Sequence, residues 1–277
     1  MDNSAVMNLL KDLVNEGPSV IPLDKGSLLI AAAFDKTLNI EEQIKLLDSL
    51  AKGVERDIAT QQDPLSLING LNNYLFDHVG LHGNESDYYD PKNSLIHHVL
   101  STRKGIPITL SLIYIEIGRR LGIPLRGVGM PGHFLVNHEK ESSFFIDAFH
   151  QGTILSKSEC AELMNRTNPA IRWSESFLNP ISNIEFLARI LRNLSAIYVK
   201  LGEHTNAISS LTMLTILQPY EPGHYRDRGM LLYQANQKEQ SLDDLLFYLS
   251  ETVAAPDKWY VERLIESIRS GGDSSTL

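Results

Sequence analysis

The chain has 277 residues, of which 43% are hydrophobic and 21% charged, as expected for a globular protein with room for one or two domains. Its net charge of −9 argues against a nucleic-acid partner, because phosphate-binding surfaces carry clustered Lys and Arg. The single cysteine, Cys160, excludes an intramolecular disulfide and a Cys-rich zinc site, and it favours a reducing, cytoplasmic setting.

The N-terminal region is expected to be helical. Apolar residues recur at helical spacing over 5–14, 26–34 and 40–54, and a further helix is expected from Asp63-Pro64 to about Gly80. Asn39 precedes the third segment and is expected to cap it. The N-terminus has early acidic residues and no apolar core, so no signal peptide is expected.

A loop is expected over 81–94, where Gly, Asn, Asp, Ser and Pro crowd together. Asn93 or Ser94 is then expected to cap a short helix that contains His97 and His98. Adjacent residues point to different faces of a helix, so we expect one of these histidines at the surface and the other half-buried. This reading disfavours metal binding by the pair.

The most apolar helix is expected over 108–121, after Pro107 at its first position. It has little polar face, which predicts that it is the buried core of its domain. Its longest apolar run is about ten residues, well short of a membrane span, so no membrane association is expected. Arg119 and Arg120 in its last turn are expected to form a solvated face.

Three short strands are expected next, at 125–130, 133–137 and 143–147, with a hairpin turn between the last two. A buried helix followed by a small antiparallel sheet predicts an α+β fold.

The C-terminal part is expected to be an all-α repeat region. We predict a first domain over 1–172 and a repeat region over 183–277. A 34-residue period pairs Ser195 with Gly229 and Ala207 with Ser241, which resembles tetratricopeptide repeats. Such stacks present concave surfaces, which predicts a protein or peptide partner for the repeat region.

Residues 105–147 have the order of a papain-like thiol site: a buried helix, a Gly-Ile-Pro-x-Arg turn at 122–126, a strand opening with His133, and a strand ending in Asp147. In order and spacing this pattern resembles the transglutaminase-like superfamily. More narrowly, 88–152 is similar to the SirB-type proteins, which join a transglutaminase-like domain to tetratricopeptide-like repeats, and the same module occurs in some F-box proteins. The resemblance implies a papain-like core.

The expected nucleophile is missing. The superfamily pattern implies a Cys at position 108, where this chain has Ile108. Cys160 follows Asp147 and lies outside the motif, so it does not take that role. Thr109 and Ser111 carry hydroxyls, but they point to other faces of the helix because each residue turns it by about 100°.

Other polar residues are candidates for the same pocket. His133 and Asp147 are expected to be hydrogen-bonded, and His150 is expected nearby. These three also suit a divalent metal by ligand type, although their spacing does not favour one. Asn93 and Arg103 match conspicuous segments of the SirB-type pattern, with loop anchoring as the simpler explanation. We expect no bound cofactor or metal.

Three functions remain open from the sequence. The first is a non-catalytic binding or regulatory protein that keeps His133 and Asp147 without the thiol. The second is a hydrolase or amidase that uses His133 and Asp147 with a water, a metal or a hydroxyl nucleophile. The third is a structural adaptor that functions through its repeat face alone. The oligomeric state does not follow from the sequence.

Overall fold

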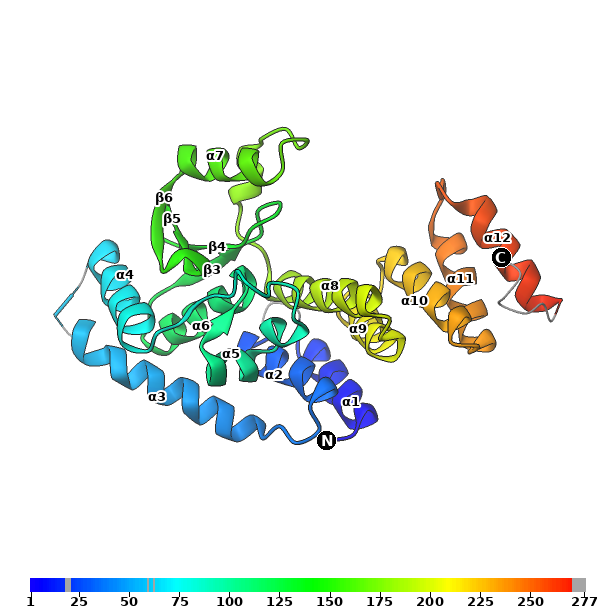
Figure 1. Cartoon of the computed structure of the whole chain (residues 1–277), viewed down its shortest axis with the longest axis horizontal. Helices are drawn as coiled ribbons and strands as arrows, with labels where there is room; N and C mark the ends of the chain where they lie inside the picture. Colours follow the sequence, from blue (N-terminus) through cyan, green and yellow to red (C-terminus); the bar gives the residue numbers. More distant parts are fainter. Residues whose placement is uncertain (18–20, 59, 62, 271–277) are drawn as a thin grey trace. The chain divides into compact units, whose positions relative to one another are not determined.

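This computed structural model describes residues 1–17, 21–58, 60–61 and 63–270, and the chain divides into two compact units, Met1–Ile190 and Leu191–Leu277 (Figure 1). The first unit combines helices with a small antiparallel sheet and the second is helical, which confirms the predicted α+β class. The predicted domain ranges, 1–172 and 183–277, remain a prediction, and residues 271–277 of the second range lie outside the described residues.

The longer elements of the first unit are the helices α1 (Asn3–Asn15), α2 (Leu23–Phe34), α3 (Ile40–Ile58), α4 (Pro64–Asn72), α5 (Ile96–Thr102), α6 (Pro107–Arg120) and α7 (Lys157–Thr167). Its strands are β1 (His82–Gly83), β2 (Lys104–Gly105), β3 (Leu125–Val128), β4 (Leu135–His138), β5 (Glu141–Asp147) and β6 (Thr153–Ser156). Its short helices are η1 (Asn73–His78), η2 (Pro91–Ser94), η3 (Ala148–His150) and η4 (Glu175–Leu178). The helix α8 (Asn183–Leu201) crosses into the second unit, which continues with α9 (His204–Leu217), α10 (Pro222–Gln234), α11 (Lys238–Glu251) and α12 (Lys258–Arg269).

Local signals account for several of the helix starts. The side chain of Asn39 accepts a hydrogen bond from the Glu42 N–H at 3.3 Å, as predicted for the start of α3. Asp63 caps α4 in the same way, but the helix expected to reach Gly80 changes at Asn73 to the wider π-type turns of η1. The predicted cap of α5 is wrong, because Leu95 occupies that position.

The sheet has the order β3-β4-β5-β6, with every neighbouring pair antiparallel. Its first three strands match the predicted ones to within a few residues. The fourth, β6, was not expected from the sequence, because its four residues are partly exposed at the edge of the sheet and show no apolar alternation. Asp147 pairs with Thr153 across β5 and β6. This pairing holds the short segment between the two strands next to Asp147.

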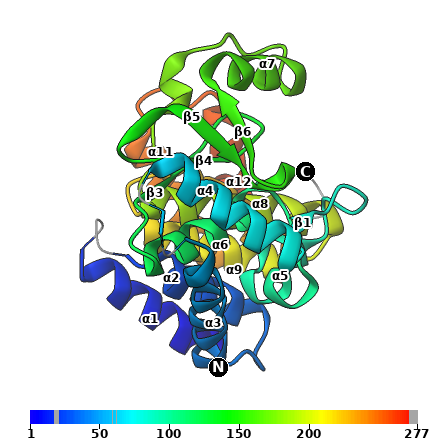
Figure 2. The ribbon, with the colours of Figure 1, turned by 90° about the vertical axis from the view of Figure 1, so that its left-hand side faces the viewer.

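The helix α6 forms the core of the first unit, as its composition predicts. Its residues from Pro107 to Gly118 are all buried. It packs against α2, α3 and α5 and against β3 and β4, so that it lies between the sheet and the N-terminal helices (Figures 1 and 2). Burial of each large apolar side chain stabilises the fold by about 1.5–3 kcal/mol relative to exposure.

The prediction of a solvated arginine pair is wrong for Arg120. Its side chain is 11% exposed, whereas that of Arg119 is 54% exposed. Arg120 donates to the buried carboxylates of Asp24 and Glu116, each at 2.7 Å. Burial raises the pKa of Glu116, while the hydrogen bond and charge of Arg120 outweigh burial at Asp24 and lower its pKa. Helix periodicity places both arginines at a helix end, but only the packing of α2 makes one of them a core residue.

The second unit consists of successive packed helices, in which α11 begins and ends 34 residues after α9. Small residues lie where α10 and α11 approach each other. The Ser241 hydroxyl donates to the Gly229 carbonyl at 2.7 Å, and a Cβ on Gly229 would lie 2.9 Å from the Leu245 side chain. Along the described residues, no helix has both the length and the apolar character needed to cross a bilayer.

Candidate functional site

The sheet brings His133 and Asp147 together at its core. His133 lies two residues before β4 begins, and Asp147 is the last residue of β5. The His133 Nε2 lies 2.8 Å from Asp147 Oδ2, and the two side chains are only 6% and 2% exposed. The other carboxylate oxygen of Asp147 accepts from the backbone N–H groups of Phe149 and His150 and so caps η3.

His150 completes a three-residue cluster. Its Nδ1 also lies 2.8 Å from Asp147 Oδ2, and its side chain is 49% exposed. Burial alone would raise the pKa of Asp147, but the hydrogen bonds and charges of His133 and His150 outweigh burial and lower that pKa. Asp147 is therefore an ionised carboxylate between one buried and one accessible imidazole.

This cluster fits a hydrogen-bonded arrangement better than a metal centre. Two ligand atoms on one tetrahedral zinc ion lie about 3.4 Å apart, because each is roughly 2.0–2.1 Å from the metal. Both histidine nitrogens lie at 2.8 Å from the same Asp147 oxygen, which is an ordinary hydrogen-bond length. A metal would have to replace both hydrogen bonds.

Arg189, which the sequence did not single out, holds the turn before His133. From α8 it donates to the carbonyls of Gly129 at 2.6 Å, Met130 at 3.2 Å and His133 at 3.4 Å. Gly132 completes this turn with a φ of 73°, which favours glycine. No local pattern could reveal Arg189, because it lies 56 residues after His133 in the sequence.

Two aromatic side chains lie next to the cluster of His133, Asp147 and His150. The Phe149 ring lies edge-on to His133, with centroids 6.3 Å apart, and Tyr88 lies edge-on to Phe149 at 6.1 Å. The loop that carries Tyr88 is anchored by Asn93, whose buried amide donates to the carbonyls of Asp87 and Tyr88 at 2.6 and 3.3 Å. Asn93 therefore contributes to the site by holding the loop that carries Tyr88.

The N-terminal end of α6 lies on the same side of the unit. β2 ends just before α6, and it pairs in parallel with β1. β1 contacts η3, and a Cβ on Gly83 would lie 2.6 Å from the Phe149 ring. Ile108, in the first turn of α6, is 3% exposed. An apolar, buried side chain therefore occupies the helix position at which the family pattern implies a thiol.

The other predicted pocket residues serve local structure. The Thr109 hydroxyl donates to the Asn93 carbonyl at 2.6 Å, and the Ser111 hydroxyl is buried without a hydrogen-bond partner. Neither is hydrogen-bonded to His133. Arg103 is exposed, and its carbonyl accepts from the His82 N–H at 2.9 Å, which joins β1 to the end of α5.

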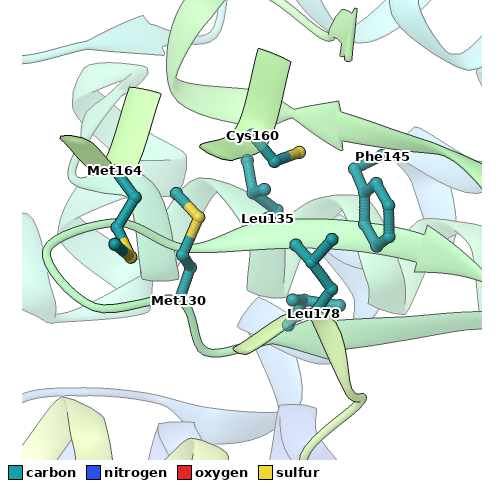
Figure 3. Packing of buried hydrophobic residues seen from close by; sticks show 7 residues of the cluster. Met130, Leu135, Phe145, Cys160, Met164 and Leu178 are labelled. Carbon is teal, nitrogen blue, oxygen red and sulfur yellow. The ribbon is translucent and has the colours of Figure 1, made fainter. Parts of the chain in front are cut away.

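Cys160, a residue of α7, lies in an apolar cluster of the first unit (Figure 3). Its fully buried side chain packs with Val128, Met130, Leu135, Phe145, Met164 and Leu178. Burial, together with the negative charge of Asp147, raises the pKa of this thiol to about 12. Cys160 therefore has the properties of a core residue and lacks those of a nucleophile.

Comparisons with known proteins agree with this architecture. A model of the transglutaminase-like superfamily matches residues 41–192. A UPF0162 protein of Xylella fastidiosa is 33% identical to this chain over 261 residues, which cover 90% of each chain. A UPF0162 protein of Vibrio cholerae is 24% identical over 244 residues, which cover 86% of this chain and 89% of that protein. Human F-box only protein 21 is 37% identical over 109 residues, which are 36% of this chain and 17% of that protein. No solved structure matches the chain significantly. The chain belongs to the transglutaminase-like superfamily and, within it, to the UPF0162 proteins.

Proposed function

We propose that this protein is a non-catalytic member of the superfamily, of the SirB type, which acts as a binding or regulatory protein in the cytoplasm. The observation that carries the proposal is the buried Ile108 at the start of α6. Thiol acyl transfer needs a nucleophile whose proton the imidazole can accept, and isoleucine has neither a lone pair nor a titratable proton.

The alternative nucleophiles do not replace the missing thiol. Cys160 is a buried thiol with a pKa of about 12, so at neutral pH it carries almost no thiolate. The Thr109 hydroxyl is committed to the Asn93 carbonyl, and Ser111 has no imidazole partner. What remains is an ionised Asp147 flanked by His133 and the accessible His150, beside the Tyr88 and Phe149 rings. Such a surface is suited to binding.

Replacement of Ile108 by Cys tests the assignment of position 108. If the scaffold of a thiol site is retained, the new thiol should react with iodoacetamide near neutral pH, and His133→Gln in that background should slow alkylation about tenfold or more. Ser111→Cys, on the same helix, is the matched control and should stay unreactive. Equal reactivity at 108 and 111 would contradict the assignment.

The wild-type protein should turn over neither ester, amide nor glutamine substrates, whereas Ile108→Cys should show burst acylation by an activated ester. Wild-type turnover that is lost in His133→Gln would establish the hydrolase alternative and overturn the non-catalytic proposal.

We further propose that the helical region binds a protein or peptide through tetratricopeptide-like repeats. The 34-residue offset between α9 and α11 and the small residues Ala207, Gly229 and Ser241 at buried positions support this reading. Tyr220 and Trp259, at 93% and 64% exposure, are aromatic residues of the kind that dominate binding interfaces.

Affinity capture with the full-length chain tests this part. A variant with Tyr220→Ser and Trp259→Ser should lose the partners captured by the wild type, while Tyr89→Ser, at an aromatic residue of the first unit that is 62% exposed, should keep them. Retention of the partners by the double variant would contradict the proposed role of these two residues.

A further inference from the structure

A second cluster of potential metal ligands lies on elements that do not carry the His133 cluster. Asp35 follows α2 as its C-cap, and His97 and His98 stand in the first turn of α5. The helices α2 and α5 pack together. One ligand atom from each of these three residues lies within 4.8 Å of the other two.

His97 is the most informative member of this cluster. Its side chain is 8% exposed, and neither ring nitrogen has a hydrogen-bond partner. The Nε2 lies 3.3 Å from Asp35 Oδ2, but the contact does not have hydrogen-bond geometry. A buried imidazole whose two nitrogens make no hydrogen bond is costly, because its polar atoms have lost their hydrogen bonds to water without replacing them.

The 3.3 Å spacing fits two ligands of one ion. Around a tetrahedral zinc ion, neighbouring ligand atoms are about 3.4 Å apart. The contrast with the His133 cluster is direct, because there the nitrogen–oxygen distances are 2.8 Å and the contacts are hydrogen bonds.

The carboxylate of Asp35 is already oriented for this role. Its Oδ1 accepts from the backbone N–H of Thr37 at 2.8 Å and from the Thr37 hydroxyl at 2.6 Å, which leaves Oδ2 turned toward His97. Outer hydrogen bonds of this kind fix the orientation of metal ligands. The same bonds lower the pKa of Asp35, and burial, with the charge of His98, lowers the pKa of His97. The carboxylate is therefore ionised and the buried imidazole neutral, as metal ligands must be.

His98 supplies the third nitrogen and an approach from solvent. It is half-buried, and its ring centroid lies 4.2 Å from that of His97. Consecutive residues on a helix diverge by about 100° at the backbone, which argues from sequence against a shared ligand. The observed ring positions bring both side chains to the same carboxylate.

We propose that Asp35, His97 and His98 bind one divalent transition-metal ion of the zinc class. Two imidazoles and a carboxylate form a donor set that suits zinc, with the fourth position open to water. The ion would join the end of α2 to the start of α5 and give the buried Nε2 of His97 a partner.

The test uses the full-length protein freed of metal with a chelator, then titrated with Co²⁺ and with Zn²⁺. The wild type should bind one equivalent, with the visible absorption of tetrahedral Co²⁺, and Zn²⁺ should raise its melting temperature. His98→Gln and Asp35→Asn should weaken binding at least tenfold and abolish the Zn²⁺-dependent rise. Both positions are partly exposed, and circular dichroism of the metal-free variants shows whether they are folded.

His150→Gln is the matched control, because it alters the other His-Asp-His cluster. It should leave the affinity for both metals unchanged. If the wild type binds neither ion at micromolar concentrations, or if His150→Gln weakens binding while His98→Gln does not, the proposal is overturned.

Discussion

His133 Nε2 lies 2.8 Å from Asp147 Oδ2, and both side chains are almost completely buried. This is the relationship between imidazole and carboxylate that orients a catalytic histidine. The first turn of α6 carries Ile108, a buried side chain with no nucleophilic atom. This hydrogen bond joins the segment before β4 to the end of β5, so its loss should lower the stability of the fold whether or not the site is catalytic.

Asp147→Asn should destabilise the protein by about 2–4 kcal/mol near neutral pH, because it removes the charge that His133 and His150 share. The folded-state pKa of Asp147 is lowered below its ordinary value of 3.8. A lowered acid pKa stabilises the folded state above the unfolded-state pKa, and this contribution is lost as the pH falls through the folded-state value. The difference between wild type and variant in urea unfolding should therefore shrink below about pH 4. A difference independent of pH would contradict the role of the charge.

Arg120→Ala should destabilise the protein by about 3–5 kcal/mol, because it removes the more buried of the two guanidinium groups that bond the buried carboxylates of Asp24 and Glu116. Arg119→Ala is the comparison, since Arg119 bonds the same two carboxylates but its side chain is 54% exposed, so that its loss should cost less than about 1 kcal/mol. Urea denaturation of the two variants measures both values. Equal losses would show that burial does not distinguish the two arginines.

Arg189→Ala should destabilise the turn before His133, at a cost of about 1–3 kcal/mol, because three backbone carbonyls lose a charged donor. Arg189→Lys should recover only part of this, since an ammonium group lacks the planar fork that reaches separate carbonyls. Denaturation gives the stability, and the imidazole signals of His133 in NMR spectra should shift in both variants. Unchanged signals would show that Arg189 does not position His133.

Cys160 should be inert to thiol reagents in the native protein. Its pKa is raised from 9.0 to about 12, which lowers the thiolate fraction about a thousandfold at neutral pH. Reaction with Ellman's reagent should be slow in buffer and fast in denaturing urea. Rapid native labelling, with the protein shown to be folded, would place Cys160 outside the apolar core.

The sequence was sufficient for the features that depend on local pattern. The apolar run of α6 has no polar face, so burial follows from composition wherever the helix lies. Period-two alternation predicted β3 to β5, and the resemblance to the superfamily pattern indicated both the His133–Asp147 pair and the position of residue 108. The edge strand β6 could not be predicted from the sequence, because it has no buried face and therefore no apolar alternation.

Tertiary packing alone decided which polar side chains meet. Arg120 is buried because α2 places Asp24 beside it, and Arg189 reaches His133 from an element 56 residues away. His97 and His98 diverge by helix geometry, yet their rings converge on Asp35 because α2 ends against α5. Periodicity determines the face of an element from which a side chain leaves. The partner it meets depends on which distant element packs on that face, and that information is absent from any local stretch of sequence.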